Sequence, residues 1–190
     1  MTSWKPDARY AVVAGLLIAA ALVPPTNLEW SRAGLAEFEV WRLLTGHWVH
    51  LGLPHLLLNL AGLLLVALLF RQQPPIVSWA VFLPASQVFI SAGLWWLTPE
   101  LEWYRGFSGC LHGLLVFTAI HNLPRERAWC GFILVAVLIK IAWEQIAGVF
   151  PGTSALIDGR VITEAHGLGA LTGLVGGIIL RMTSRLHSDR

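Results

Sequence analysis

Six long apolar stretches, separated by short polar segments, restrict what this chain of 190 residues can fold into. A helix needs about 20 apolar residues to cross the roughly 30 Å hydrocarbon layer of a bilayer, and fewer where flanking side chains reach the interface. We therefore expect an all-α polytopic membrane protein, a bundle of six transmembrane helices that forms a single domain over residues 1–190. The predicted spans are about 9–24, 53–70, 76–97, 107–121, 128–150 and 165–182.

The composition excludes an ordinary water-soluble fold. Hydrophobic residues make up 56% of the chain and charged residues 13%, whereas an average soluble domain is about 25% charged. A nucleic-acid partner is not expected, because the basic residues lie between apolar stretches and do not gather on one water-exposed face. In the longest outer loop, about residues 25–52, Trp30, Trp41 and Trp48 are predicted to anchor the chain in the headgroup layer.

The distribution of basic residues predicts the orientation of the six spans. Positive residues concentrate on the cytoplasmic side of membrane proteins, so both chain ends are predicted to lie inside. The first span is short and follows Lys5 and Arg9, so a cleavable signal peptide is the alternative interpretation of that segment. The inner set is Lys5, Arg9, Arg71, Arg125, Arg127, Arg181, Arg185 and Arg190, and the outer set is Arg32, Arg42, Arg105 and Arg160.

Several polar side chains lie where the second, fourth and sixth spans begin. With the amino terminus inside, each even-numbered helix begins at the outer face, so these groups are expected to converge on one leaflet. Polar groups inside a membrane helix are costly, which makes each a functional candidate, with interhelical hydrogen bonding as the alternative. The set is His50, His55 and Asn59 in the second span and its approach, Ser108 and His112 in the fourth, and His166 in the sixth.

Ser108 and His166 are the strongest candidates for chemistry. Ser108 opens its helix in Gly106-Phe107-Ser108-Gly109, where free backbone N–H groups and the helix dipole would stabilise an oxyanion. Helix capping is the alternative role of this serine. His166 opens the sixth span, and a histidine base beside a serine hydroxyl is the arrangement that a serine nucleophile needs.

Glycine patterns suggest how these two residues could meet. The fourth span contains Gly109-x3-Gly113 and the sixth Gly169-x3-Gly173-x3-Gly177, and such faces allow close approach of helix backbones. Simple glycine packing is the alternative. No carboxylate is expected to complete a triad, because Glu164 lies two residues from His166 and projects to another side of the helix, so a Ser-His dyad is predicted.

Three further side chains have open roles. His112 lies one turn after Ser108 and could stack on the catalytic imidazole, bond to it, or only pack. Lys140 and Glu144 are four residues apart in an apolar helix, so we expect them to pair with each other. Alternatively, Glu144 contacts the substrate beside the cleavage point.

The order and spacing of several short motifs, between about residues 40 and 180, resemble the rhomboid intramembrane serine proteases. The resemblance implies a nucleophile at Ser108, a general base and acid at His166, and no metal or cofactor. It also implies an oxyanion site formed by His55, Asn59 and the Ser108 N–H, in a water-filled cavity open to the outer face. The motifs are Trp41-Arg42, Thr45-Gly46-His47-Trp48-Val49-His50, His55-x3-Asn59, Gly106-x-Ser108-Gly109 and Ala165-His166-x2-Gly169-x3-Gly173.

Within that family, the short chain, the stretch from Ser108 to Gly113 and the pair Trp143-Glu144 resemble the rhombosortase branch. This resemblance implies a bacterial inner-membrane enzyme that cuts carboxy-terminal GlyGly-CTERM transmembrane tails on the periplasmic side. Substrates would be proteins carrying such membrane tails. One departure is His112, which stands where rhomboids commonly carry a tyrosine packed on the catalytic histidine.

Two other function classes remain open from the residues. Histidines on converging helix ends could hold a metal or haem, and a rhomboid-like protein could bind membrane helices without cutting them. The presence of both Ser108 and His166 argues against the second class. The histidines concerned are His47, His50, His55, His112 and His166.

Overall fold

A computed structural model describes residues 7–188 of the chain, so Lys5 and Arg190 of the predicted inner basic set lie outside the described residues. Within that range the protein is helical, with one short antiparallel ribbon. The helices are α1 (Ala8–Ala20), α2 (Pro25–Leu28), α3 (Arg32–Ala36), α4 (Arg42–Thr45), α5 (Leu53–Leu69), α6 (Ile76–Leu97), α7 (Ser108–Asn122), α8 (Arg127–Ala147), α9 (Thr153–Ile157) and α10 (Thr163–Ser188). The ribbon consists of β1 (Trp30–Ser31) and β2 (Trp103–Tyr104).

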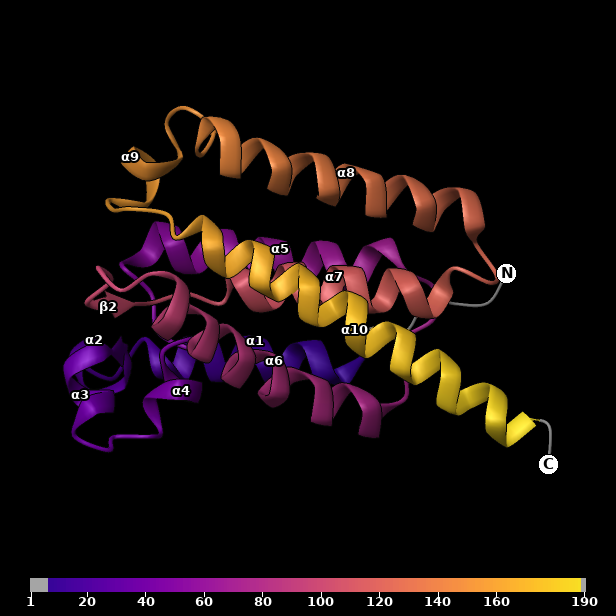
Figure 1. Cartoon of the computed structure of the whole chain (residues 1–190), viewed down its shortest axis with the longest axis horizontal. Helices are drawn as coiled ribbons and strands as arrows, with labels where there is room; N and C mark the ends of the chain where they lie inside the picture. Colours follow the sequence, from indigo (N-terminus) through magenta and orange to yellow (C-terminus); the bar gives the residue numbers. More distant parts are fainter. Residues whose placement is uncertain (1–6, 189–190) are drawn as a thin grey trace.

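Six long helices, α1, α5, α6, α7, α8 and α10, form an elongated bundle (Figure 1). By length and composition α6, α8 and α10 can each cross a membrane, and α1 and α5 are shorter apolar helices. Each of the six begins within two residues of the segment predicted for it. The predicted fold class, an all-α bundle with membrane-spanning helices, is confirmed.

Helix α7 is the central element of the bundle. It contacts α5, α6, α8 and α10, and eleven of its fifteen residues are buried. Small residues such as Gly109 and Gly113 let neighbouring helices come close to it. The first residue of this buried helix is Ser108, so the candidate nucleophile is attached to the most enclosed part of the fold.

The interface between α7 and α10 is the most extensive helix contact in the described chain. A Cβ atom added at Gly109 would lie 2.7 Å from the carbonyl oxygen of Ala165, and one at Gly169 would overlap the carbonyl of Gly109. Gly173 faces the carbonyl of Gly113 in the same way. The two backbones are therefore in direct contact, and the predicted meeting of the two glycine faces is confirmed.

The segment between α1 and α5 folds into α2, α3, α4 and β1 at the end of the bundle that also holds β2 and α9 (Figure 1). Arg32 ties this segment to α6 and to the turn that follows it, since its guanidinium donates to the carbonyl oxygens of Trp95 at 3.2 Å and of Thr98 and Leu101 at 2.9 Å. The expectation that Trp30 anchors the chain in lipid headgroups is wrong. Its side chain is fully buried, because β1 pairs with β2 and Arg32 lies over its ring.

Candidate active site

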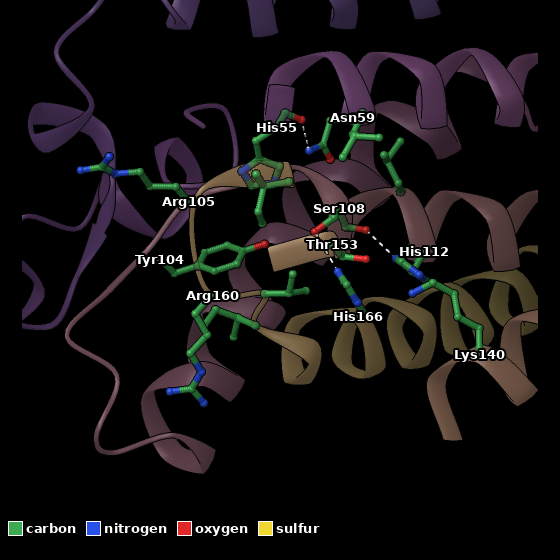
Figure 2. A pocket seen from close by; sticks show the side chains of 15 residues that line it. His55, Asn59, Tyr104, Arg105, Ser108, His112, Lys140, Thr153, Arg160 and His166 are labelled. Carbon is green, nitrogen blue, oxygen red and sulfur yellow. Dashed lines mark hydrogen bonds between the residues drawn. The ribbon is translucent and has the colours of Figure 1, made fainter. Parts of the chain in front are cut away.

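Ser108 and His166 meet at the end of the α7–α10 interface. The Ser108 Oγ and His166 Nε2 atoms are 2.9 Å apart, a hydrogen-bond distance (Figure 2). His166 lies in the first turn of α10 and is 5% exposed, so its ring has little freedom to turn away. The close backbone contact between the two helices sets this distance. The pair therefore has the geometry of a nucleophile and its base.

The turn before Ser108 is held by two hydrogen bonds at Gly106. Gly106 has φ +135°, a conformation that side-chain-bearing residues rarely adopt, and a Cβ there would lie 2.8 Å from His55 Cε1. The Tyr104 hydroxyl donates to the Gly106 carbonyl at 2.7 Å, and the Gly106 N–H donates to the Gly46 carbonyl at 3.2 Å. Burial raises the pKa of the Tyr104 phenol, so this donor keeps its proton.

His55 and Asn59 line the same cavity as Ser108, which has a volume of about 280 Å³ (Figure 2). The Leu51 N–H donates to His55 Nδ1 at 3.4 Å, which places the imidazole proton on Nε2. Asn59 Nδ2 donates one hydrogen to the His55 carbonyl at 2.9 Å and has a second hydrogen for another acceptor. Both side chains can therefore donate a hydrogen bond into the cavity.

His112 stacks on His166. The ring centroids are 4.3 Å apart with an interplanar angle of 21°, and His112 Nδ1 donates to the Ser108 carbonyl at 2.7 Å. Of the roles left open by the sequence, the structure shows stacking on the candidate base. Where rhomboids commonly carry a tyrosine packed on the histidine, this chain therefore has His112 stacked on His166.

Glu144 of α8 bonds to both His166 and Lys140. His166 Nδ1 donates to Glu144 Oε2 at 2.9 Å, and Lys140 Nζ donates to Glu144 Oε1 at 2.6 Å. The predicted Lys140–Glu144 pair is confirmed, whereas the expectation that no carboxylate reaches His166 is wrong. The segment after α8 returns the chain so that α10 lies beside α8, and spacing along one helix does not reveal such a contact.

His50 and His47 lie in the loop that precedes α5. His50 packs against a residue that lines the cavity, and His47 bonds to α6. The His50 ring packs edge-on against His55, with centroids 5.0 Å apart. His47 Nε2 lies 3.0 Å from both the Gln87 carbonyl and Ser91 Oγ on α6. Burial, with a smaller contribution from His55, lowers the pKa of His50 to about 3, and burial lowers that of His47 to about 4, so both are neutral at pH 7.

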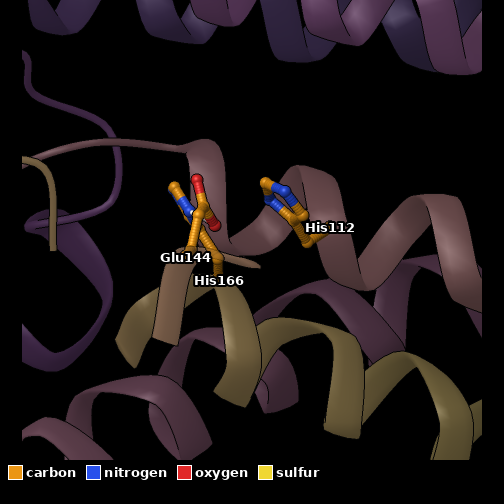
Figure 3. A group of neighbouring side chains, drawn as sticks. All are labelled: His112, Glu144 and His166. Atoms are coloured by element: carbon orange, nitrogen blue, oxygen red, sulfur yellow. Dashed lines mark hydrogen bonds and ion pairs between the residues drawn. The ribbon is translucent and has the colours of Figure 1, made fainter. Parts of the chain in front are cut away.

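The metal interpretation rests on His112, Glu144 and His166, whose ligand atoms lie within 4.8 Å of one another (Figure 3). Both oxygens of Glu144 and both ring nitrogens of His166 already have protein partners. The two imidazole rings are stacked, so their in-plane lone pairs run side by side and do not converge on one point. His47 faces α6 and takes no part in this group. The arrangement suits proton transfer better than metal binding.

Comparisons with known proteins identify the family to which the sequence is similar. A family model described as the Rhomboid domain matches residues 37–183. The chain is 28% identical over 160 residues to RHOMBOID-like protein 2 of Arabidopsis thaliana, covering 80% of this chain and 46% of that protein. It is also 43% identical over 47 residues to Inactive RHOMBOID-like protein 8 of the same plant, covering 25% of this chain and 13% of that protein. The chain thus spans less than half the length of either relative.

Proposed function

The chain belongs to the rhomboid family, and on that premise we propose that it is an intramembrane serine endopeptidase with Ser108 as the nucleophile. The observation that carries the proposal is the 2.9 Å hydrogen bond between Ser108 Oγ and His166 Nε2 in a cavity among membrane helices. His55 and Asn59 line that cavity and can donate hydrogen bonds to the reacting carbonyl.

In the proposed first step, the Ser108 hydroxyl attacks the carbonyl carbon of the scissile peptide bond. His166 Nε2 accepts the hydroxyl proton and then transfers it to the leaving amine, so that an acyl-enzyme on Ser108 forms. A water molecule, deprotonated by His166 in the same manner, hydrolyses the acyl-enzyme and restores the serine. The cavity supplies the space that this water needs.

The oxygen of the tetrahedral intermediate carries a negative charge, and we propose that hydrogen-bond donors at the start of α7 and on α5 stabilise it. Ser108 opens α7, where the backbone N–H groups of the first turn have no partner within the helix. His55 Nε2–H and the free Asn59 amide hydrogen are the two side-chain donors. Each donor that faces the developing charge contributes about 3 kcal/mol in serine hydrolases.

For the substrate, we propose carboxy-terminal GlyGly-CTERM membrane tails, cut at the periplasmic face of a bacterial inner membrane. Support comes from the stretch Ser108 to Gly113 and the pair Trp143-Glu144, which resemble rhombosortases. The cavity volume of about 280 Å³ also favours a cleavage segment with small side chains such as glycine. A less selective rhomboid protease, acting on other transmembrane substrates, is the broader form of this proposal.

The proposal is tested with purified protein in liposomes and a reporter carrying a GlyGly motif, one apolar helix and a basic end. We expect cleavage by the unaltered protein, none by the Ser108→Ala variant, and at least tenfold slower cleavage when both reporter glycines are replaced by leucine. Equal cleavage of the glycine and leucine reporters would contradict the GlyGly assignment and leave the broader protease proposal standing.

A second candidate is a protein that holds transmembrane helices without cutting them. Its support is the 43% identity with a relative whose name describes it as inactive. Reporter that co-purifies with the liposome-reconstituted protein but stays intact over days would favour this candidate. The presence of the bonded Ser108–His166 pair favours the protease.

A further inference from the structure

We propose that Glu144 is the positioning residue for His166, so that the site works as a Ser108–His166–Glu144 triad whose carboxylate is also paired with Lys140. This inference rests on the proposed protease function and deepens it. It assigns a role in the reaction to a residue of α8, a helix that contributes neither the nucleophile nor the base.

The four side chains form one continuous chain of hydrogen bonds. Lys140 Nζ lies 2.6 Å from Glu144 Oε1, Glu144 Oε2 lies 2.9 Å from His166 Nδ1, and His166 Nε2 lies 2.9 Å from Ser108 Oγ. Each carboxylate oxygen has its own partner, and each imidazole nitrogen has its own partner. The network is therefore complete from the half-buried ammonium group to the serine hydroxyl.

The carboxylate selects the imidazole tautomer that the reaction needs. To accept the serine proton, His166 Nε2 must be bare, so its proton must lie on Nδ1. A carboxylate can only accept a hydrogen bond, and Glu144 therefore stabilises the Nδ1–H form. When Ser108 transfers its proton, the resulting imidazolium faces an opposite charge at 2.9 Å, which stabilises the transition state.

Burial indicates that the inward orientation of Glu144 serves the site. The side chain of Glu144 is 5% exposed and that of Lys140 is 36% exposed, so the pair is turned with its carboxylate toward the interior. The other buried residues of α8 are Cys130, Ile133 and Val137. If Lys140 and Glu144 served only to neutralise each other, both groups could lie at the edge of the bundle, and Glu144 would not need its second bond, to His166.

The chain offers a matched control in Glu164. It lies in the first turn of α10, two residues before His166, but among the described residues it makes no hydrogen bond to the His166 ring. Glu164→Gln therefore removes one negative charge near the imidazole without touching its orientation. Any effect of general charge should appear in both glutamate variants, and an effect of positioning only in Glu144→Gln.

The test compares steady-state cleavage by Glu144→Gln, Glu144→Asp and Glu164→Gln in liposomes. We expect Glu144→Gln to lower kcat about 100-fold with KM unchanged, because the amide no longer enforces the Nδ1–H tautomer. Glu144→Asp should recover part of the loss, since it keeps an acceptor-only carboxylate. Glu164→Gln should stay within threefold of the unaltered protein.

Two results would overturn the role of Glu144. A raised KM with unchanged kcat would make it a substrate contact, and equal losses in Glu144→Gln and Glu164→Gln would make the effect one of general charge. If the single variant does not fold, the double variant Lys140→Met/Glu144→Gln carries the same test, because it leaves no unpaired charge in the helix.

A spectroscopic measurement separates this inference from the proposed function. In ¹⁵N-histidine-labelled protein, the His166 resonances, identified by their loss in His166→Ala, report which ring nitrogen carries the proton. We expect the Nδ1–H form in the unaltered protein and a mixture of tautomers in Glu144→Gln. An unchanged tautomer overturns the inference even if the protein cleaves reporters, and the predicted change supports it even if no reporter is cut.

Discussion

The two helices that flank α7 near its serine end, α10 and α8, are packed in opposite ways. Against α10 the backbones touch through Gly109 and Gly169, with no side chain between them. In contrast, α8 lies at the outside of the bundle, and only four of its twenty-one residues are buried. The first contact fixes where Ser108 and His166 lie, and the second supplies the Glu144 carboxylate that accepts a hydrogen bond from His166 Nδ1. The position of His166 and the hydrogen bond to its Nδ1 atom thus come from different helices.

The largest expected effect comes from breaking the rigid interface. In Gly169→Ala the added methyl group overlaps the Gly109 carbonyl, which belongs to the backbone and cannot move aside. We expect a loss of about 3 kcal/mol or more in unfolding free energy and no detectable cleavage. Reversible unfolding in mixed micelles measures the first quantity. A variant with unchanged stability would show that the two helices are not in direct backbone contact.

Acid should destabilise the protein through His47, which lies in the loop before α5. His47 is neutral when folded, with its pKa lowered by burial from 6.5 to about 4, and it binds a proton readily once unfolded. The unfolded state therefore takes up more protons between these values, and stability falls as the pH drops below about 6.5. Between pH 8 and pH 5 the expected loss from His47 is about 2 kcal/mol.

Thermal unfolding at the two pH values checks this prediction, with His47→Gln as the comparison. Glutamine keeps a donor for the Gln87 carbonyl but cannot titrate, so the variant should lose less stability on acidification. The same pH dependence in both proteins would contradict the assignment to His47.

The smallest effect is expected for a substitution in α8, the more exposed of the two helices. Gly131 of α8 has open space around the position where a Cβ would lie. Gly131→Ala should therefore keep full activity and change the unfolding free energy by less than about 1 kcal/mol, in the stabilising direction. It is the matched control for Gly169→Ala, and a loss of several kcal/mol would show that α8 is packed as tightly as α10.

The sequence predicted the helices and the meeting of Ser108 with His166 because both depend on local patterns. Apolar length fixes where a helix can cross a membrane, and the glycine repeats around Gly109 and Gly169 show which faces meet. The burial of Trp30 was not predictable, since it depends on the pairing of β1 with β2, more than 70 residues apart.

Glu144 shows the limit of reasoning from spacing. Its ionisable group in an apolar helix marked it as a functional candidate, but Lys140 one turn away offered a sufficient local partner. The bond to His166 joins residues 22 positions apart on different helices, and the return of the chain from α8 to α10 creates it. Helix packing, which no single motif encodes, turned a predicted dyad into a group of three.

The most direct test of the central claim is the reaction of detergent-purified protein with a fluorophosphonate, with the modified residue identified by peptide mass spectrometry. The account predicts a covalent label on Ser108 that is lost in His166→Ala, because the hydroxyl needs that base to become nucleophilic. A folded, unaltered protein that takes no label, or a label on Ser108 that persists without His166, would contradict the proposed catalytic pair.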